Sequence, residues 1–225
     1  MTDATTTTTT STAAANCGGD VPYNAGPATD RDGGNGGNAA SASPSPSSLL
    51  LVGAARPGAI KQRCFDLSAP KVTAAEVDAW ADEMINKHGA QRVVGLLTAS
   101  ELATYEPGAL EQLGERFSGD GRWRNVLGVK EGDAAALREV LDLIDAGVQA
   151  GERVVVHCWG GGGRTGNALA GWLAARGEKV EAAEAARRVC DYAARHGLKR
   201  RADAAGVQQY VDAYRQVEGG RGGQQ

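Results

Sequence analysis

Residues 154–177 read VVVHCWGGGGRTGNALAGWLAARG, and this stretch decides the fold. The apolar run that ends at His157 predicts a buried strand, and four consecutive glycines follow it almost at once. Leu169, Trp172 and Leu173 then recur at helical spacing. Open α/β sheets bind ligands at the carboxyl ends of their strands, and a helix that begins there offers unpaired N–H groups to an anion. The segment therefore predicts a strand, a phosphate-binding loop and a helix, in that order.

The chain around this segment alternates between strand and helix patterns. Strands are predicted at 49–54, 92–97, 123–129 and 153–157. Helices are predicted at 74–89, after a capping box at Thr73–Glu76, and at 98–105, 107–117, 137–148, 165–176, 179–195 and 202–216. Strands separated by helices are typical of a largely parallel sheet that is covered on both faces. We expect an α/β fold with a single central, mostly parallel sheet of about five strands flanked by helices.

The composition changes near residue 49. Residues 1–48 contain no Leu, Ile or Phe, and such a stretch cannot bury enough apolar surface to offset its ordering entropy. We therefore expect a disordered low-complexity tail at 1–48, one folded domain at 49–217 and a disordered C-terminus at 218–225. Deletion of 1–46 is expected to leave the melting temperature and the turnover nearly unchanged.

Charge and cysteine usage narrow the classes of function. The net charge of −3 at pH 7 resides in the tail, so the domain is neutral and has no electrostatic footprint for nucleic acid or an anionic membrane. No apolar run is long enough to span a membrane and the N-terminus lacks a secretory signal, so we expect a cytoplasmic protein. The four cysteines form no CxxC pair and no HExxH occurs, so no metal or other cofactor is expected.

Several motifs compete for the glycine-rich loop. Gly161, Gly163 and Gly166 fit the GxGxxG dinucleotide fingerprint, but that fingerprint opens a domain, and here only helical patterns follow. A Walker A loop would need Gly at 158 and Lys at 164, where the chain has Cys and Arg. A turn of purely structural use leaves that Cys and that Arg unexplained. A phosphate loop built around Cys158 and Arg164 uses both.

Residues 157–166, HCWGGGGRTG, match the pattern HCxxGxGR[ST]G at every specified position. The string resembles the signature of the cysteine-dependent protein tyrosine phosphatase superfamily, and the size and element order of the domain resemble its small dual-specificity type. The resemblance implies that Cys158 is the nucleophile and that Arg164 binds the phosphate with its planar fork. Five residues between them let the backbone wrap a tetrahedral phosphate with its N–H groups pointing inward, and glycines permit the backbone conformations this needs.

The rest of the loop is expected to share in this chemistry. The phosphate-binding positions besides Arg164 are Trp159, Gly160, Gly161, Gly162 and Gly163. Cys158 lies at the start of a helix, which lowers the pKa of a thiol and favours the thiolate. Thr165 is placed to donate its hydroxyl to the sulfur when the thiolate leaves. The resemblance implies that His157 supports the cysteine from behind the loop and takes no part in proton transfer.

The leaving oxygen needs a proton, and the resemblance places an Asp for this purpose on an earlier loop, in a pattern such as LPVPD. The corresponding residues, 127–133, read LGVKEGD: both prolines are absent, and Glu131 stands where Asp is expected. Asp133 comes directly before a run of alanines and is placed to cap the helix that begins there. We therefore expect Glu131 to be the general acid, with Asp133 as the alternative.

These residues predict a phosphatase that hydrolyses phosphate monoesters through a phosphocysteine intermediate. The expected substrates are phosphotyrosine and/or phosphoserine and phosphothreonine in proteins. The altered acid loop keeps open an alternative, a catalytically weak phosphate-binding (pseudophosphatase) interaction module. The expected partner is a phosphorylated protein or another phosphomonoester, with neither nucleic acid nor membrane, and we expect a monomer.

Two groups of residues outside the loop are given structural roles. Cys64 and Cys190 are expected to be small buried hydrophobes, and nothing in the sequence supports a redox role for Cys64. The basic cluster Lys199–Arg201 is expected to be a solvated helix start.

Overall fold

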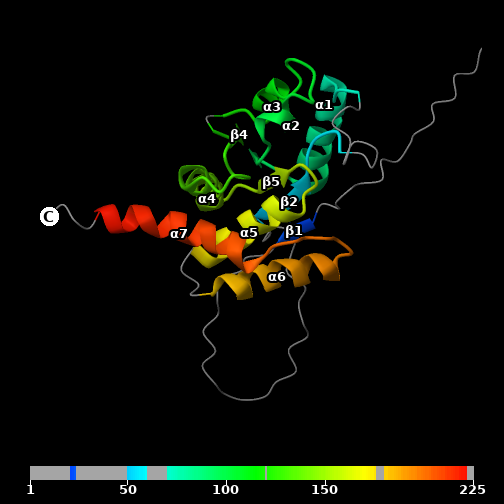
Figure 1. Ribbon diagram of the computed structural model, residues 1–225. Helices are drawn as coiled ribbons and strands as arrows, with labels where there is room; N and C mark the ends of the chain where they lie inside the picture. Colours follow the sequence, from blue (N-terminus) through cyan, green and yellow to red (C-terminus); the bar gives the residue numbers. More distant parts are fainter. Residues whose placement is uncertain (1–20, 24–49, 60–69, 120, 176–179, 222–225) are drawn as a thin grey trace, which may run out of the picture.

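The structure is a computed structural model of the 225-residue chain and describes residues 21–23, 50–59, 70–119, 121–175 and 180–221. Its strands are β1 (Val21–Tyr23), β2 (Leu51–Ala55), β3 (Arg92–Gly95), β4 (Trp123–Asn125) and β5 (Val154–Cys158). They form one sheet in the order β1-β2-β5-β3-β4, in which β1 is antiparallel to β2 and every other pair is parallel. The predicted α/β fold with a mostly parallel sheet is confirmed (Figure 1).

The helices are α1 (Ala74–Asp82), which continues as the π-helical turn η3 (Glu83–Lys87), α2 (Ala99–Leu102), α3 (Glu111–Arg116), α4 (Ala134–Gln149), α5 (Gly163–Ala175), α6 (Ala182–Arg195) and α7 (Ala204–Arg221). Figure 1 shows α1, α2 and α3 on one side of the sheet and α5, α6 and α7 on the other. Successive side chains of a strand point to opposite faces, so Val155 of β5 packs in the core on the α1–α3 side. Val154 and Val156 pack in the core that α4, α5, α6 and α7 share. The carboxyl ends of the four parallel strands meet at one edge, which is left to the loops.

Both ends of the predicted domain differ from expectation. The segment Val21–Tyr23, assigned to the disordered tail, forms β1 and extends the sheet by pairing with β2. Its Val and Tyr favour a strand, which the composition of the whole tail concealed. At the other end, α7 continues to Arg221, past the boundary predicted at 217. The remainder of the predicted tails, 1–20, 24–48 and 222–225, lies outside the described residues, as does residue 49 of the predicted domain.

β4 is shorter than the predicted strand 123–129 and ends at Asn125. Gly128 has a φ of +84°, and its carbonyl accepts a hydrogen bond from the Asp133 N–H at 3.1 Å. The chain therefore turns toward α4 where the apolar pattern alone predicted continued extension. Within the described parts of the chain, no helix is long and apolar enough to cross a membrane.

Candidate active site

The predicted strand, loop and helix are β5, residues 159–162 and α5. Cys158 is the last residue of β5 and its side chain is buried. Gly161 has a φ of +67°, and a Cβ at this position would lie 2.7 Å from the carbonyl oxygen of Ala54. Both observations restrict the position to glycine, because no other residue fits so close to the backbone of β2. Gly162 accepts a hydrogen bond from the Gly166 N–H at 2.9 Å, so the loop closes directly onto the first turn of α5.

Arg164 is held at the start of α5 by the loop that follows β3. Its Nη1 donates to the carbonyl oxygen of Leu96 at 2.5 Å and to Glu101 Oε2 at 2.7 Å, and its Nη2 donates to Glu101 Oε1 at 2.5 Å. Burial favours a lower pKa for Arg164, but the hydrogen bonds to Glu101 outweigh it and raise the pKa above its ordinary value. The guanidinium is therefore charged and held in a defined orientation.

Glu101 is a site residue that the sequence did not predict. It lies in α2 and forms a capping box with Thr98: Glu101 N donates to Thr98 Oγ1 at 3.3 Å, and Thr98 N donates to Glu101 Oε2 at 2.8 Å. Burial acts to raise the pKa of the Glu101 carboxyl, but hydrogen bonds from Arg164 and Thr98 hold the pKa below its ordinary value. The T-x-x-E pattern at 98–101 is visible in the sequence, but it indicates only a helix cap. It does not indicate the contact between Glu101 and Arg164.

Asn125, at the end of β4, fixes the turn that presents Leu96 to Arg164. Its Nδ2 donates to the Leu97 carbonyl at 3.0 Å and its Oδ1 accepts from the Leu97 N–H at 2.9 Å. Leu96 N–H also donates to the carbonyl of His157 at 2.8 Å. Because both neighbouring peptide groups are held, the carbonyl of Leu96 has a defined direction toward Arg164.

His157 is fully buried behind the loop, and neither of its ring nitrogens has a hydrogen-bond partner in the described parts of the chain. Its ring lies edge-on to Trp80 at 5.4 Å between centroids and stacks on Trp123 at 6.0 Å with an interplanar angle of 7°. Burial lowers the pKa of His157 to about 3; the nearby Cys158 backbone acts in the opposite direction. The imidazole is therefore neutral at physiological pH.

Thr165 is buried near the start of α5, and its Oγ1 has no hydrogen-bond partner in the described parts of the chain. The expected hydrogen bond to the sulfur of Cys158 is therefore not formed in this state. A role for Thr165 in releasing the thiolate would require its hydroxyl to turn toward the sulfur during the reaction.

The two candidate acids have different environments. Asp133 is the N-cap of α4, where its Oδ1 accepts a hydrogen bond from the Ala136 N–H at 2.8 Å, as the sequence predicted. Glu131 is exposed, and its negative charge contributes to raising the pKa of Arg164. The structure thus uses Asp133 as a helix cap, whereas the charge of Glu131 acts on Arg164.

Trp159 is half-buried beside the loop, stacked against an arginine that the sequence analysis did not single out. The guanidinium carbon of Arg56 lies 3.7 Å from the centroid of a Trp159 ring, which is cation–π geometry. Arg56 directly follows β2, is 2% exposed and donates to the Pro57 carbonyl at 3.2 Å. The indole is held against this buried cation, in the residue that directly follows Cys158.

Arg200 does not belong to a solvated helix start, and this part of the prediction is wrong. It is buried, and its guanidinium donates to the carbonyl oxygens of Gly161 in the loop and Gly53 in β2. The connection between α6 and α7 packs against the loop, which the run of basic residues did not indicate. Cys190 is half-buried with its sulfur 3.7 Å from the Arg200 carbonyl, whereas Cys64 lies outside the described residues.

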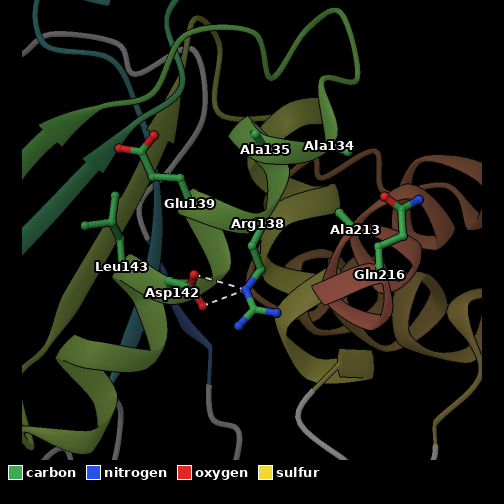
Figure 2. A pocket seen from close by; sticks show the side chains of 8 residues that line it. All are labelled: Ala134, Ala135, Arg138, Glu139, Asp142, Leu143, Ala213 and Gln216. Atoms are coloured by element: carbon green, nitrogen blue, oxygen red, sulfur yellow. Dashed lines mark hydrogen bonds and ion pairs between the residues drawn. The ribbon is translucent and has the colours of Figure 1, made fainter. Parts of the chain in front are cut away.

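A groove of about 660 Å³ lies between α4 and α7 and contains none of the loop residues 157–164. In Figure 2, Arg138 is paired with Asp142 of the same helix, α4, and Gln216 of α7 lies on the facing side. Arg138 Nε donates to Asp142 Oδ1 at 2.8 Å. This groove is therefore separate from the phosphate loop. In the residues that the structure describes, no group of three or more His, Cys, Asp or Glu side chains is placed to hold a metal ion.

Comparison with known proteins shows which family model and which solved structures this chain resembles. Residues 121–178 match the family model described as Tc-R-P: Polymorphic toxin system, DSP-PTPase phosphatase. The chain is similar to the crystal structure of PTPMT1, with 10% identity, 77% of this chain and 94% of that chain covered, and a TM-score of 0.51. It is also similar to kinase associated phosphatase with its catalytic-site cysteine substituted by serine, at 18% identity, 76% and 88% coverage and a TM-score of 0.51. No curated protein matches the chain.

The structural likeness shows the fold, and the matched segment contains the signature loop together with the acid loop. These findings confirm the resemblance to the protein tyrosine phosphatase and dual-specificity phosphatase superfamily.

Proposed function

We propose that the protein hydrolyses phosphate monoesters through a phosphocysteine intermediate on Cys158. The observation that carries the proposal is the arrangement of Cys158 and Arg164 at the two ends of one glycine loop that closes onto the N-terminus of α5. Backbone N–H groups and the positive end of the helix dipole favour a phosphate there. The guanidinium fork adds two donors for phosphate oxygens and for the charge of the transition state.

In the first step the Cys158 thiolate attacks phosphorus and forms the S–P bond while the ester P–O bond breaks. Glu131 donates a proton to the oxygen that leaves, so the substrate departs as a neutral alcohol or phenol. The exposed position of Glu131 and the influence of its charge on Arg164 support this role. Asp133 is engaged as the cap of α4.

In the second step water attacks the phosphocysteine, the S–P bond breaks, and inorganic phosphate and the thiolate are released. The deprotonated Glu131 accepts a proton from the attacking water, which restores the acid for the next cycle. The Thr165 hydroxyl, which is buried without a partner in the described structure, turns to donate to the sulfur as it leaves. No metal or other cofactor takes part in either step.

Phosphorylated proteins are the proposed substrates, and the proposal includes phosphotyrosine, phosphoserine and phosphothreonine. The variable positions of the loop are Trp159 and glycines, which provide no cluster of cations for a polyphosphorylated ring. The protein acts as a monomer in the cytoplasm. Since the matching family description names polymorphic toxin systems, growth of cells expressing wild type or Cys158→Ser tests whether turnover harms a cell.

The second candidate function is a phosphate-binding module that does not turn over. Its support is the replacement of the expected Asp by Glu131 and the engagement of both Arg164 nitrogens by Glu101. Hydrolysis of an aryl phosphate by purified wild type, with Cys158→Ser as the control, decides between the two. Activity that is lost in Cys158→Ser supports the phosphatase; equal background rates with retained phosphopeptide binding support the module. Panels of phosphopeptides and phosphoinositides then test the substrate class.

A further inference from the structure

Arg201 places a further arginine beside the phosphate loop, from a different part of the chain. A Cβ at Gly162 would lie 3.4 Å from Nε and 3.5 Å from Nη2 of Arg201. The guanidinium thus occupies the space that a side chain at this variable loop position would take. The loop sequence contains no cation between Cys158 and Arg164, but the fold supplies one from the connection between α6 and α7.

This connection is anchored to the loop and to α5 on both sides of Arg201. The Arg201 N–H donates to the Gly162 carbonyl at 3.5 Å, and the preceding Arg200 donates to the Gly161 carbonyl. Asp203 N–H donates to Asn167 Oδ1 at 2.9 Å, and Asn167 Nδ2 returns a bond to Asp203 Oδ2 at 3.3 Å. Because the backbone is fixed before and after it, Arg201 keeps its place next to the loop.

The positive charge of Arg201 is not paired with an acidic side chain in the described part of the chain. Its side chain is exposed and forms no ion pair or hydrogen bond with a described residue. The two neighbouring arginines differ, since Arg164 is paired with Glu101 and Arg200 is buried among carbonyls. A free guanidinium fork beside an anion site suits a second anionic group, such as a carboxylate.

We propose that Arg201 binds a carboxylate next to the scissile phosphate, so that the preferred substrates are phosphopeptides with an acidic residue directly beside the phosphorylated one. This inference rests on the proposed function and names its substrate class more closely. A single cation on one side of the loop fits one neighbouring carboxylate. A polyphosphorylated ring would also have to approach the carboxylates of Glu101 and Glu131, whose charges act on Arg164 from other segments.

The test compares two phosphopeptides that differ only in Glu or Gln beside the phosphorylated residue. Wild type is expected to favour the Glu peptide about fivefold in kcat/KM at low ionic strength, mostly through KM, as for an exposed ion pair. Added salt should reduce this preference because it screens exposed charges. In Arg201→Gln the ratio should fall close to one, and Arg201→Lys should retain part of it. Arg215→Gln, which removes an exposed arginine of α7 instead, should keep the ratio of wild type.

Binding to Cys158→Ser, measured by calorimetry with the same peptides, separates this inference from the proposed turnover. If the peptides bind to Cys158→Ser but wild type does not hydrolyse them, phosphatase function fails. The Glu-to-Gln ratio of Kd, with and without Arg201→Gln, then still decides the role of Arg201. An equal effect of Arg201→Gln on both peptides, or none, overturns the inference. Absence of binding to either peptide overturns both. If Arg201→Gln loses phosphoinositide turnover in vesicles but keeps the peptide preference, Arg201 binds a lipid headgroup. That outcome also overturns the inference.

Discussion

Glu101 binds both terminal nitrogens of Arg164, at 2.7 Å and 2.5 Å, across 63 residues of sequence. The same carboxylate completes the capping box of α2, so one side chain fixes the start of a short helix and the direction of the Arg164 guanidinium. A phosphate that binds in the loop therefore meets a guanidinium whose rotamer is already chosen, which reduces the entropy lost on binding.

Replacing Glu101 by Gln keeps the cap, because Gln also completes a capping box, but removes the charge that holds Arg164. We expect kcat/KM for an aryl phosphate to fall about tenfold and the free energy of unfolding to fall by about 1.5–3 kcal/mol, as for a hydrogen bond to a charged group. Steady-state kinetics and thermal unfolding measure the two effects. Glu106→Gln, an exposed acid in the following turn, is the matched control.

The stability effect of Glu101→Gln should depend on pH. The pKa of Glu101 is lowered in the folded state, so its contribution is present above the ordinary pKa of 4.5 and is lost as pH falls through the folded pKa. The difference in melting temperature between wild type and variant should be full at pH 7 and shrink below about pH 4.5. A difference that grows as the pH falls would contradict the ion pair.

The general acid can be identified from the leaving group. Glu131→Gln is expected to slow the hydrolysis of an alkyl phosphate about 100-fold or more. The effect on an aryl phosphate should be much smaller, because its phenoxide leaves without a proton. Asp133→Asn should change turnover little and stability only slightly, since Asn caps a helix about as well as Asp. If Asp133→Asn shows the leaving-group dependence and Glu131→Gln does not, the two roles must be exchanged.

Two neighbouring glycines of the loop offer a matched test of its geometry. Gly161→Ala must accept a positive φ and a Cβ 2.7 Å from the Ala54 carbonyl oxygen. We therefore expect this variant to lose inhibition by vanadate, an analogue of phosphate, and to melt several degrees lower than wild type. Gly160→Ala places its methyl group where no described atom lies within 4 Å, and should retain both. Equal behaviour of the two variants would show that the loop adapts to a side chain at 161.

The strand β1 changes what is expected of N-terminal truncation. Deletion of residues 1–24 exposes the edge of β2, and we expect the melting temperature to fall by about 2–8 °C, from the loss of a few backbone hydrogen bonds. Deletion of 1–18, which retains β1, is the control. Equal melting temperatures for both truncations and the full chain would mean that the pairing adds nothing to stability.

The sequence predicted what is local in this structure. The strand, the glycine loop and α5 follow one another directly, and Asp133 caps a helix that begins at the next residue, so short patterns were enough for these features. The contacts of Glu101 and Arg200 with the site span 63 and 39 residues, and no short pattern encodes them. The capping motif at 98–101 and the basic cluster at 199–201 each had an ordinary local explanation. Neither pattern indicated the additional contact with Arg164 or Gly161.

β1 was missed for a related reason. A strand of three residues takes its stability from the edge of β2 and not from its own composition, so the character of the surrounding tail predicted disorder. The same holds for Asn125, a residue type that is rare within strands but here ends β4 and clamps the turn at Leu97.

The packing of Arg200 and Arg201 on the loop has a consequence for the order in which the protein is made. Translation delivers Cys158 and Arg164 well before the connection between α6 and α7. A nascent chain that has emerged only to residue 178 therefore has Cys158 but lacks Arg200, which binds the Gly161 carbonyl. The glycine-rich loop therefore acquires this support only after Arg200 has been added to the chain. A ribosome-bound or prematurely terminated product should bind phosphate poorly even though its signature sequence is intact.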